Sequence, residues 1–157
     1  MKIQFYSIGR EHEAYVKTGV EDFTRRIARY YPVEWKIIAP PKHAAVLQEA
    51  ELRQKEAASV FELLRKEDFL VALDETGKSM SSPDLAAFLQ VRANESVKQM
   101  IFLIGGAYGL HESVIKRANY IWSLSKLTFP HQLVRLILAE QVYRACTILR
   151  NEKYHHA

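Results

Sequence analysis

Hydrophobic and polar positions follow two different periods along this chain, and the periods mark strands and helices in turn. Short runs rich in apolar and β-branched residues predict strands, whose successive side chains face opposite sides of a sheet. Longer stretches with apolar residues three and four apart predict amphipathic helices. The predicted strands are residues 2–8, 33–38, 69–73, 100–104 and 120–124, and the predicted helices are residues 11–29, 43–65, 81–91, 111–118 and 130–150.

The alternation of strands with helices predicts how the chain is organised. Strands separated by helices pair in parallel, so we expect an α/β fold with a mostly parallel sheet flanked by helices. No linker or internal repeat divides the sequence, and residues 1–157 are expected to form a single domain. Ligands in open α/β sheets bind beyond the carboxyl ends of strands, here after Leu73, Ile104 and Leu124.

The last predicted helix carries apolar residues around nearly its whole circumference. Its polar positions are Arg135, Glu140, Gln141, Arg144, Thr147 and Arg150. A helix of this kind is buried on more than one side. The second side is covered either by another subunit or by other elements of the same chain, and the pattern does not choose between them.

Composition narrows the class of protein. Hydrophobic residues make up 48% and charged residues 25%, which is typical of a globular domain and not of a disordered chain. The lone Cys146 excludes a disulfide framework and is expected to be a core residue. The longest mostly apolar stretch, residues 101–110, is far shorter than the ~20 residues of a membrane span. No signal-peptide pattern precedes it, so a cytoplasmic protein without a membrane partner is expected.

Charge is unevenly distributed. The formal net charge is +4, and it arises from residues 100–157, which hold seven Lys and Arg against three Asp and Glu. Four of the six histidines lie in the same part of the chain. A local basic excess favours a polyanionic partner, although scattered surface charges would give the same count.

Two loops carry candidate ligand-binding groups. Residues 105–109, Gly-Gly-Ala-Tyr-Gly, match neither a dinucleotide nor a nucleotide-triphosphate fingerprint, and form either a ligand-binding loop or a tight turn. In residues 122–131, Ser125 and Thr128 precede a helix, where a polar or anionic ligand binds readily and where Thr128 would also cap the helix. Asp74 ends a strand and either contacts a ribose hydroxyl or stabilises a polar turn.

The C-terminal segment combines Tyr154, His155 and His156 with the nearby cations Arg144 and Arg150. Such groups stack on bases, contact phosphates or move protons, whereas an ordinary terminus is frayed. No third ligand stands at metal-binding spacing near the two histidines, so no metal is expected.

These segments together resemble one family. They are residues 71–78 (VALDETGK), 102–109 (FLIGGAYG), 123–131 (SLSKLTFPH), 133–135 (LVR), 140–145 (EQVYRA) and 154–155 (YH). In length and order the chain is similar to the bacterial RlmH family, the 23S rRNA pseudouridine N3-methyltransferases of the SPOUT superfamily. The resemblance implies a homodimer with a C-terminal trefoil knot, acting on N3 of a pseudouridine in assembled ribosomes.

The resemblance also implies a cofactor and site residues. The cofactor is S-adenosylmethionine, and its contacts fall on Leu73, Gly105, Leu124, Ser125, Lys126, Leu127, Thr128 and Phe129. The N3 proton must leave, and His155 is the candidate base or proton relay, because histidine titrates near neutral pH. Tyr154 is expected to stack on or hydrogen-bond the base, and Arg144 to contact phosphate.

Two residues depart from the family pattern, and one alternative function stays open. Tyr108 stands where the family often has an acid, and His156 follows His155 where many members have Arg. A phosphate contact from that terminal position is therefore weaker here or is supplied by another residue. The competing interpretation is a non-catalytic α/β protein that binds nucleotides or ribosomes.

Overall fold

The computed structural model describes residues 1–156, and its centre is a five-stranded parallel sheet. The strands are β1 (Lys2–Ile8), β2 (Val33–Ile38), β3 (Phe69–Lys78), β4 (Gln99–Ile104) and β5 (Tyr120–Trp122). Their order across the sheet is β2-β1-β4-β3-β5, and every neighbouring pair is parallel. The predicted α/β class is confirmed.

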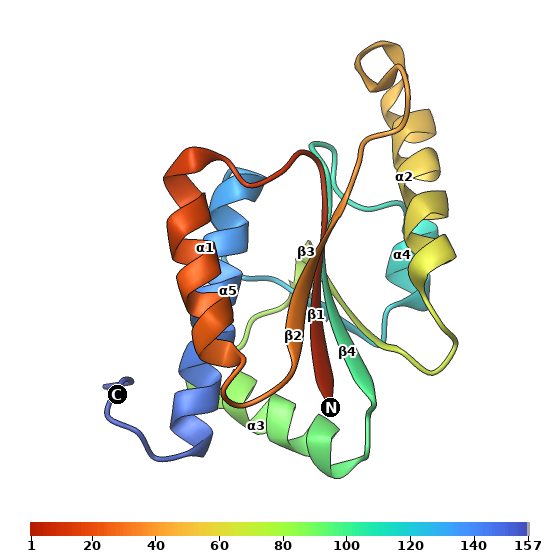
Figure 1. Cartoon of the computed structure of the whole chain (residues 1–157). Coiled ribbons are helices and arrows are strands. Elements are labelled where there is room, and N and C mark those ends of the chain that lie inside the picture. Colours follow the sequence, from red (N-terminus) through yellow and green to blue (C-terminus); the bar gives the residue numbers. More distant parts are fainter. Residues whose placement is uncertain (157) are drawn as a thin grey trace.

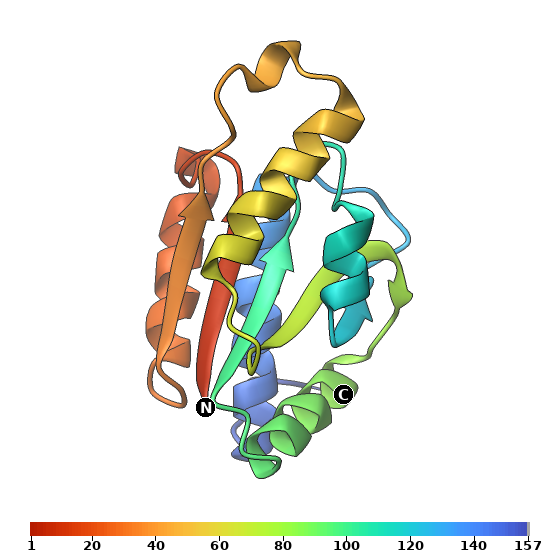
Figure 2. The same cartoon turned by 90° about the vertical axis from the view of Figure 1, so that its right-hand side faces the viewer.

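Helices cover both faces of the sheet. They are α1 (Ala14–Ile27), the short 3-10 helix η1 (Ala44–Val46), α2 (Glu49–Leu63), α3 (Ser82–Asn94), α4 (Glu112–Arg117) and α5 (His131–Leu149). Figure 1 shows α1, α3 and α5 on one face and α2 and α4 on the other, and Figure 2 turns the second face toward the viewer. Among residues 1–156, no helix is long and apolar enough to span a membrane.

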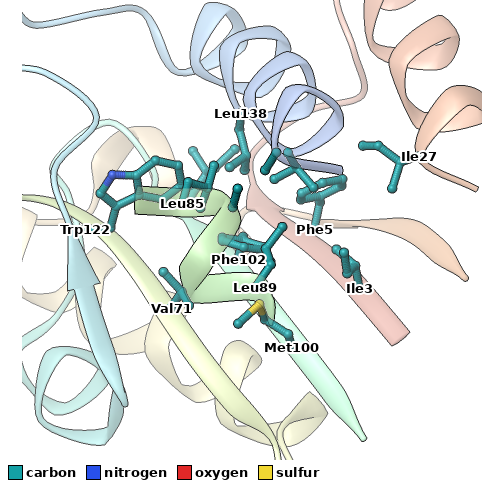
Figure 3. Packing of buried hydrophobic residues seen from close by; sticks show 14 residues of the cluster. Ile3, Phe5, Ile27, Val71, Leu85, Leu89, Met100, Phe102, Trp122 and Leu138 are labelled. Atoms are coloured by element: carbon teal, nitrogen blue, oxygen red, sulfur yellow. The ribbon is translucent and has the colours of Figure 1, made fainter. Parts of the chain in front are cut away.

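Each face of the sheet has its own hydrophobic core. The larger cluster joins the sheet to α1, α3 and α5, with Phe5, Phe102, Leu89 and Leu138 buried at its centre (Figure 3). The smaller cluster lies under α2 and α4 and includes Tyr6, Val60, Leu103 and Val114. Continuous apolar strands are expected when both faces are covered, which is why β4 is buried from Met100 to Ile104.

Helix α5 packs mainly within its own chain. It contacts α1 and α3, and none of its residues is fully exposed. The contact with α1 is close, because a Cβ atom on Gly19 would lie 2.6 Å from Leu136 Cδ1. Leu133 and Ile137 are half-buried and belong to neither core cluster. Burial inside the protomer thus explains most, but not all, of the apolar circumference of α5.

The structure corrects several predicted boundaries. The long helix predicted for residues 43–65 is divided, because His43 has a φ of 60° and Leu47 and Gln48 are extended. Strand β3 continues past its predicted end to Lys78, and its pairing with β5 is irregular between Leu73 and Lys78. The predicted start of α3 is confirmed by a capping box between Ser81 and Asp84.

Cys146 is a core residue, as expected. It is 1% exposed. Burial raises the pKa of its thiol to about 12. A thiol that stays protonated in this way is a poor nucleophile, which agrees with a structural role.

Candidate functional site

Three segments meet at a pocket of about 550 Å³, one in the carboxyl-terminal half of β3 and two beyond the carboxyl ends of β4 and β5. The first segment begins at Leu73 within β3, the others follow Ile104 and Trp122 at the ends of β4 and β5, and the three strands are adjacent in the sheet. Parallel pairing brings the three ends to the same edge, so loops distant in sequence share one site. The lining residues are Arg53, Leu73–Thr76, Ile104–Leu110, Trp122–Ser125, Leu127–Phe129, His131 and Val134.

Most of the predicted cofactor contacts line this pocket. They are Leu73, Gly105, Leu124, Ser125, Leu127, Thr128 and Phe129. Lys126 is the exception, and its predicted role has no support from the pocket geometry. Sequence reasoning missed Arg53, Trp122 and Val134, because each lies inside a strand or helix whose pattern indicates only packing.

The glycine loop after β4 brings main chain close to the pocket. Gly106 and Gly109 are bridged, and Gly109 has a φ of 79°, a conformation that favours glycine. A Cβ atom on Gly105 would lie 3.0 Å from Leu110 Cδ2 and 3.1 Å from the carbonyl carbon of Gly109. Any side chain at Gly105 would therefore press on the loop that forms the pocket wall.

The loop before α5 is held by its own hydroxyl groups. The Ser123 hydroxyl donates to the Ser125 carbonyl oxygen at 3.1 Å, and the Leu127 N–H donates to Ser125 Oγ at 3.0 Å. The alternative in which Thr128 caps the helix is wrong, because Pro130 is the N-cap residue and has no side-chain cap bond. Thr128 instead lines the pocket.

Asp74 stabilises its own turn. Its carboxylate accepts a hydrogen bond from the Thr76 N–H at 3.1 Å and another from the Thr76 hydroxyl. This geometry matches the polar-turn interpretation of Asp74. The residue also lines the pocket.

Two residues that line the pocket each carry a buried N–H group without a partner. Among residues 1–156, neither Trp122 Nε1 nor Arg53 Nε has a hydrogen-bond partner, and both are buried. Burying an N–H donor without a partner costs free energy, and such donors are uncommon in folded proteins. Both residues line the pocket, whereas the other atoms of this kind in residues 1–156, Gln4 Oε1, Arg92 Nε and Arg135 Nη2, belong to residues that do not.

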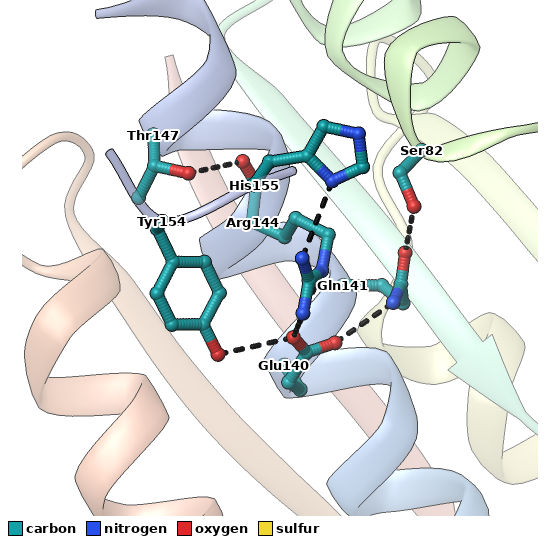
Figure 4. A network of polar contacts seen from close by, with 7 residues as sticks. All are labelled: Ser82, Glu140, Gln141, Arg144, Thr147, Tyr154 and His155. Carbon is teal, nitrogen blue, oxygen red and sulfur yellow. Dashed lines mark hydrogen bonds and ion pairs between the residues drawn. The ribbon is translucent and has the colours of Figure 1, made fainter. Parts of the chain in front are cut away.

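A second polar cluster lies around Glu140 on α5 (Figure 4). Glu140 Oε1 accepts hydrogen bonds from Arg144 Nη2 at 2.6 Å, Arg144 Nε at 3.0 Å and the Tyr154 hydroxyl at 3.1 Å. Glu140 Oε2 accepts one from Gln141 Nε2 at 2.8 Å, and Gln141 in turn accepts from the Ser82 hydroxyl. The C-terminal segment is therefore attached to α5 and is not frayed.

The same cluster sets the orientation of His155. Arg144 Nη1 lies 3.2 Å from His155 Nδ1, and its guanidinium lies 4.7 Å from the centre of the Tyr154 ring. A guanidinium can only donate, so Nδ1 accepts and the neutral ring carries its proton on Nε2. Burial, reinforced by Glu140, raises the pKa of the Tyr154 hydroxyl, which keeps it protonated as a donor.

The pocket and the C-terminal cluster do not meet within this chain. The predicted catalytic residues Arg144, Tyr154 and His155 contact one another, but none of them lines the pocket. Val134 lines the pocket, and Arg144 is ten residues further along α5, which is about 15 Å at 1.5 Å per residue. In Figure 1 the C-terminus lies near the far end of α5.

Within residues 1–156, no three His, Cys, Asp or Glu side chains gather closely enough to bind a metal ion. The potential ligands His155 and His156 occupy the C-terminal segment, where Nδ1 of His155 already accepts from Arg144.

Comparison with known proteins identifies relatives along the whole chain. A family model described as "Predicted SPOUT methyltransferase" matches residues 1–155. Two curated relatives named Ribosomal RNA large subunit methyltransferase H are similar over their full length. The protein from Geobacter metallireducens is 43% identical over 157 residues, covering 100% of both chains. The one from Cytophaga hutchinsonii is 42% identical over 156 residues, covering 99% of this chain and 100% of its own.

Two solved structures share the fold at low sequence identity. A probable methyltransferase from Bordetella pertussis Tohama I has a TM-score of 0.58 and 14% identity, covering 92% of this chain and 96% of its own. A probable methylase family protein from Haemophilus influenzae Rd KW20 has a TM-score of 0.54 and 11% identity, covering 99% of this chain and 70% of its own.

Proposed function

Because the chain belongs to the SPOUT methyltransferase family, we propose that it methylates 23S ribosomal RNA, with S-adenosylmethionine as donor. The acceptor is N3 of a pseudouridine in the assembled ribosome. The observation that carries the proposal is the pocket formed by the three strand-end loops whose residues resemble the cofactor contacts of the family. The cytoplasm, where ribosomes work, is the corresponding location.

The pocket residues fit this cofactor. A volume of about 550 Å³ lies within the ordinary range of sites for ligands of this size. Leu73, Leu124 and Phe129 offer apolar surface to an adenine ring, and the buried Trp122 Nε1 is a donor without a partner among residues 1–156. Glycines at 105 and 106 leave the main chain open to close approach.

Bound S-adenosylmethionine supplies an electrophilic methyl group, so the chain itself has to orient the acceptor base and accept a proton. The imide proton of N3 must be removed as the new bond forms. His155 accepts it at Nδ1, the unprotonated ring nitrogen, once Arg144 turns from that nitrogen to the RNA. Arg144 contacts the RNA phosphate, and Tyr154 stacks on or hydrogen-bonds the pseudouridine.

We further propose that the protein is a homodimer in which the C-terminal cluster of one protomer serves the pocket of the other. The separation of the two sites along α5 supports this arrangement, since no residue of the cluster lines its own pocket. Leu133 and Ile137, half-buried and outside both cores, provide apolar surface for the dimer contact. Such an interface should bury more than about 1,000 Å².

The chain near the pocket also supports a trefoil knot. Leu73 and Lys78 both pair with Trp122, so residues 74–77 form an excursion beside β5. The excursion is tight, because a Cβ atom on Gly77 would lie 2.5 Å from the Ile121 carbonyl oxygen. We propose that the segment after β5 passes through the loop made here before it enters α5.

The test of function is transfer of tritiated methyl groups to ribosomes that lack the modification. Incorporation into 23S rRNA, mapped to a pseudouridine, is expected with the wild-type protein. Ribosome binding without incorporation would instead favour the non-catalytic alternative. Calorimetry with S-adenosylmethionine, NAD and ATP separates a methyltransferase from a general nucleotide-binding protein, because only the first compound should bind tightly.

The shared site is tested by mixing two inactive variants. A heterodimer of His155→Ala and Gly105→Val holds one intact pocket and one intact C-terminal cluster in opposite protomers. If the site is shared, mixing restores up to about half of the activity per heterodimer. If cluster and pocket act within one protomer, the mixture stays inactive. Light scattering that gave the mass of a single 157-residue chain would contradict the dimer.

A further inference from the structure

Two large apolar side chains at the pocket are exposed. Tyr108 is 50% exposed and Leu127 is 71% exposed, and both residues line the pocket. The other exposed large apolar side chains of residues 1–156 lie elsewhere; they are Tyr15, Val46, Phe61 and Val91. Single exposed apolar residues are ordinary on a protein surface, whereas two that line one ligand pocket form an apolar rim.

Hydrogen bonds hold the main chain of this rim on both sides. Tyr108 belongs to the tight turn from Gly106 to Gly109, which is closed by a hydrogen bond from the Gly109 N–H to the Gly106 carbonyl oxygen at 3.1 Å. The Leu127 N–H donates to Ser125 Oγ at 3.0 Å. The two exposed side chains are therefore positioned before a ligand arrives, which lowers the entropy cost of binding one.

The Tyr108 side chain has no specific partner within the described chain. Among residues 1–156, its hydroxyl takes part in no hydrogen bond, and neither an aromatic ring nor a cation packs on its ring. Tyr154 differs in each respect: it packs on Tyr143 with 4.7 Å between ring centres, lies under Arg144 and donates to Glu140. Tyr108 therefore keeps aromatic surface available beside the pocket.

The depth of the pocket residues separates two kinds of apolar surface. Leu73, Leu124 and Phe129, which offer surface to the adenine of the cofactor, are half-buried, whereas Tyr108 and Leu127 are exposed. In the proposed reaction the acceptor nitrogen must line up with the methyl group, so the base has to leave the RNA stack and enter the mouth of the pocket. Unstacked RNA bases are held by stacking on aromatic side chains. The exposed rim lies where such a base arrives.

We propose that Tyr108 stacks on the acceptor base of the RNA at the mouth of the pocket, and that Leu127 adds apolar contact beside it. The inference rests on the proposed function and deepens it, because it names the residues that receive the base after it leaves the RNA stack. A base has two faces, so stacking on Tyr108 leaves the second face to Tyr154. The cofactor keeps the half-buried surfaces below the rim.

Substitutions at the rim separate stacking from simple apolar contact. Tyr108→Leu keeps an apolar side chain and removes the ring, whereas Tyr108→Phe keeps the ring and removes the hydroxyl. Phe61→Leu is the matched control, because Phe61 is an aromatic side chain on α2 that is 40% exposed and does not line the pocket. Single-turnover methyl transfer is measured over a range of concentrations of unmodified ribosomes. Calorimetry with S-adenosylmethionine and light scattering are measured on the same proteins.

Tyr108→Leu is expected to lower the maximal rate divided by the half-saturating ribosome concentration by about fivefold to fiftyfold, the effect of losing one base–aromatic stack. The affinity for S-adenosylmethionine should stay within twofold of the wild type, and the mass in solution should not change. Tyr108→Phe should retain most of the rate, because the ring remains. Leu127→Ala should give a smaller loss than Tyr108→Leu, and Phe61→Leu should give none.

Other results overturn the proposal in identifiable ways. A parallel loss of S-adenosylmethionine affinity in Tyr108→Leu would assign the ring to the cofactor, and a change in mass would make the rim a contact between protomers. Equal losses in Tyr108→Leu and Tyr108→Phe would attribute the effect to the hydroxyl and not to stacking. An unchanged rate in Tyr108→Leu would show that the ring does not contact the base. A wild-type protein that transfers no methyl group to ribosomes would instead contradict the proposed function itself, and this inference with it.

Discussion

The two polar regions of this molecule differ in how completely their hydrogen-bonding groups are paired. Around Glu140, the carboxylate accepts four hydrogen bonds and holds Arg144 and Tyr154 in one arrangement. Around the strand-end pocket, Trp122 Nε1 and Arg53 Nε have no partner among residues 1–156. A fully satisfied network fixes side chains in position, whereas unsatisfied buried groups favour a ligand. The contrast therefore separates a positioning region from a binding region.

The strongest test of this division is the loss of His155. His155→Ala should lower single-turnover methyl transfer by roughly 10²–10⁴, the usual range for general acid–base catalysis. The affinity for S-adenosylmethionine should stay unchanged, because His155 does not line the pocket. His156→Ala is the matched control, since its side chain is exposed next in sequence. A His155→Ala rate within threefold of the wild type would remove His155 from the chemistry.

The converse test changes the pocket alone. Gly105→Val should weaken S-adenosylmethionine at least about tenfold, because its side chain would displace Leu110 and Gly109 from the pocket wall. Gly105→Ala should cause a smaller loss, since a single methyl group meets mainly the flexible Leu110 side chain. Circular dichroism checks that both variants keep the fold. Native spectra with unchanged affinity would show that the loop is only a turn.

A smaller effect is expected when the hydrogen bonds of the C-terminal cluster are weakened while Arg144, Tyr154 and His155 are kept. Glu140→Gln replaces the shared acceptor of Arg144 and Tyr154 by a neutral amide. The Arg144–Glu140 pair is about three-quarters buried, so unfolding free energy should fall by about 1–2 kcal/mol. Methyl transfer should fall about tenfold through misplacement of His155, with cofactor affinity unchanged. Loss of stability with a normal rate would restrict Glu140 to a structural role.

The smallest effect concerns Tyr154 at alkaline pH. Its pKa is raised in the folded protein, mainly by burial and then by Glu140, so the folded state holds the phenolic proton more tightly than the unfolded state. The stability that this provides is complete below the unfolded pKa near 10 and is lost as pH rises through the folded pKa. Denaturation between pH 9 and pH 11 should therefore show a shallower decline in Tyr154→Phe than in the wild type. Parallel curves would contradict the shift.

The sequence by itself determined the class of the fold and much of the pocket. Period-two apolar runs separated by helical patterns led to a parallel sheet, because those periods report which faces are buried. Parallel strands then place their carboxyl ends together, which is why the segments after Leu73, Ile104 and Trp122 line one pocket. The resemblance supplied the expected cofactor and its expected contacts, of which Lys126 is the one that does not line the pocket.

Only the tertiary structure decided which groups lack partners and which sites are separate. Glu56 lies on a helix whose pattern indicates ordinary solvated charge, and it is buried because its carboxylate packs against Gly106 of the glycine loop. Thr128 does not cap α5, because Pro130 occupies the N-cap position and the helix begins at His131. The distance between the C-terminal cluster and the pocket is likewise a property of how α5 crosses the sheet. Local sequence encodes periodicity and turns, whereas these features arise from contacts between segments far apart in the chain.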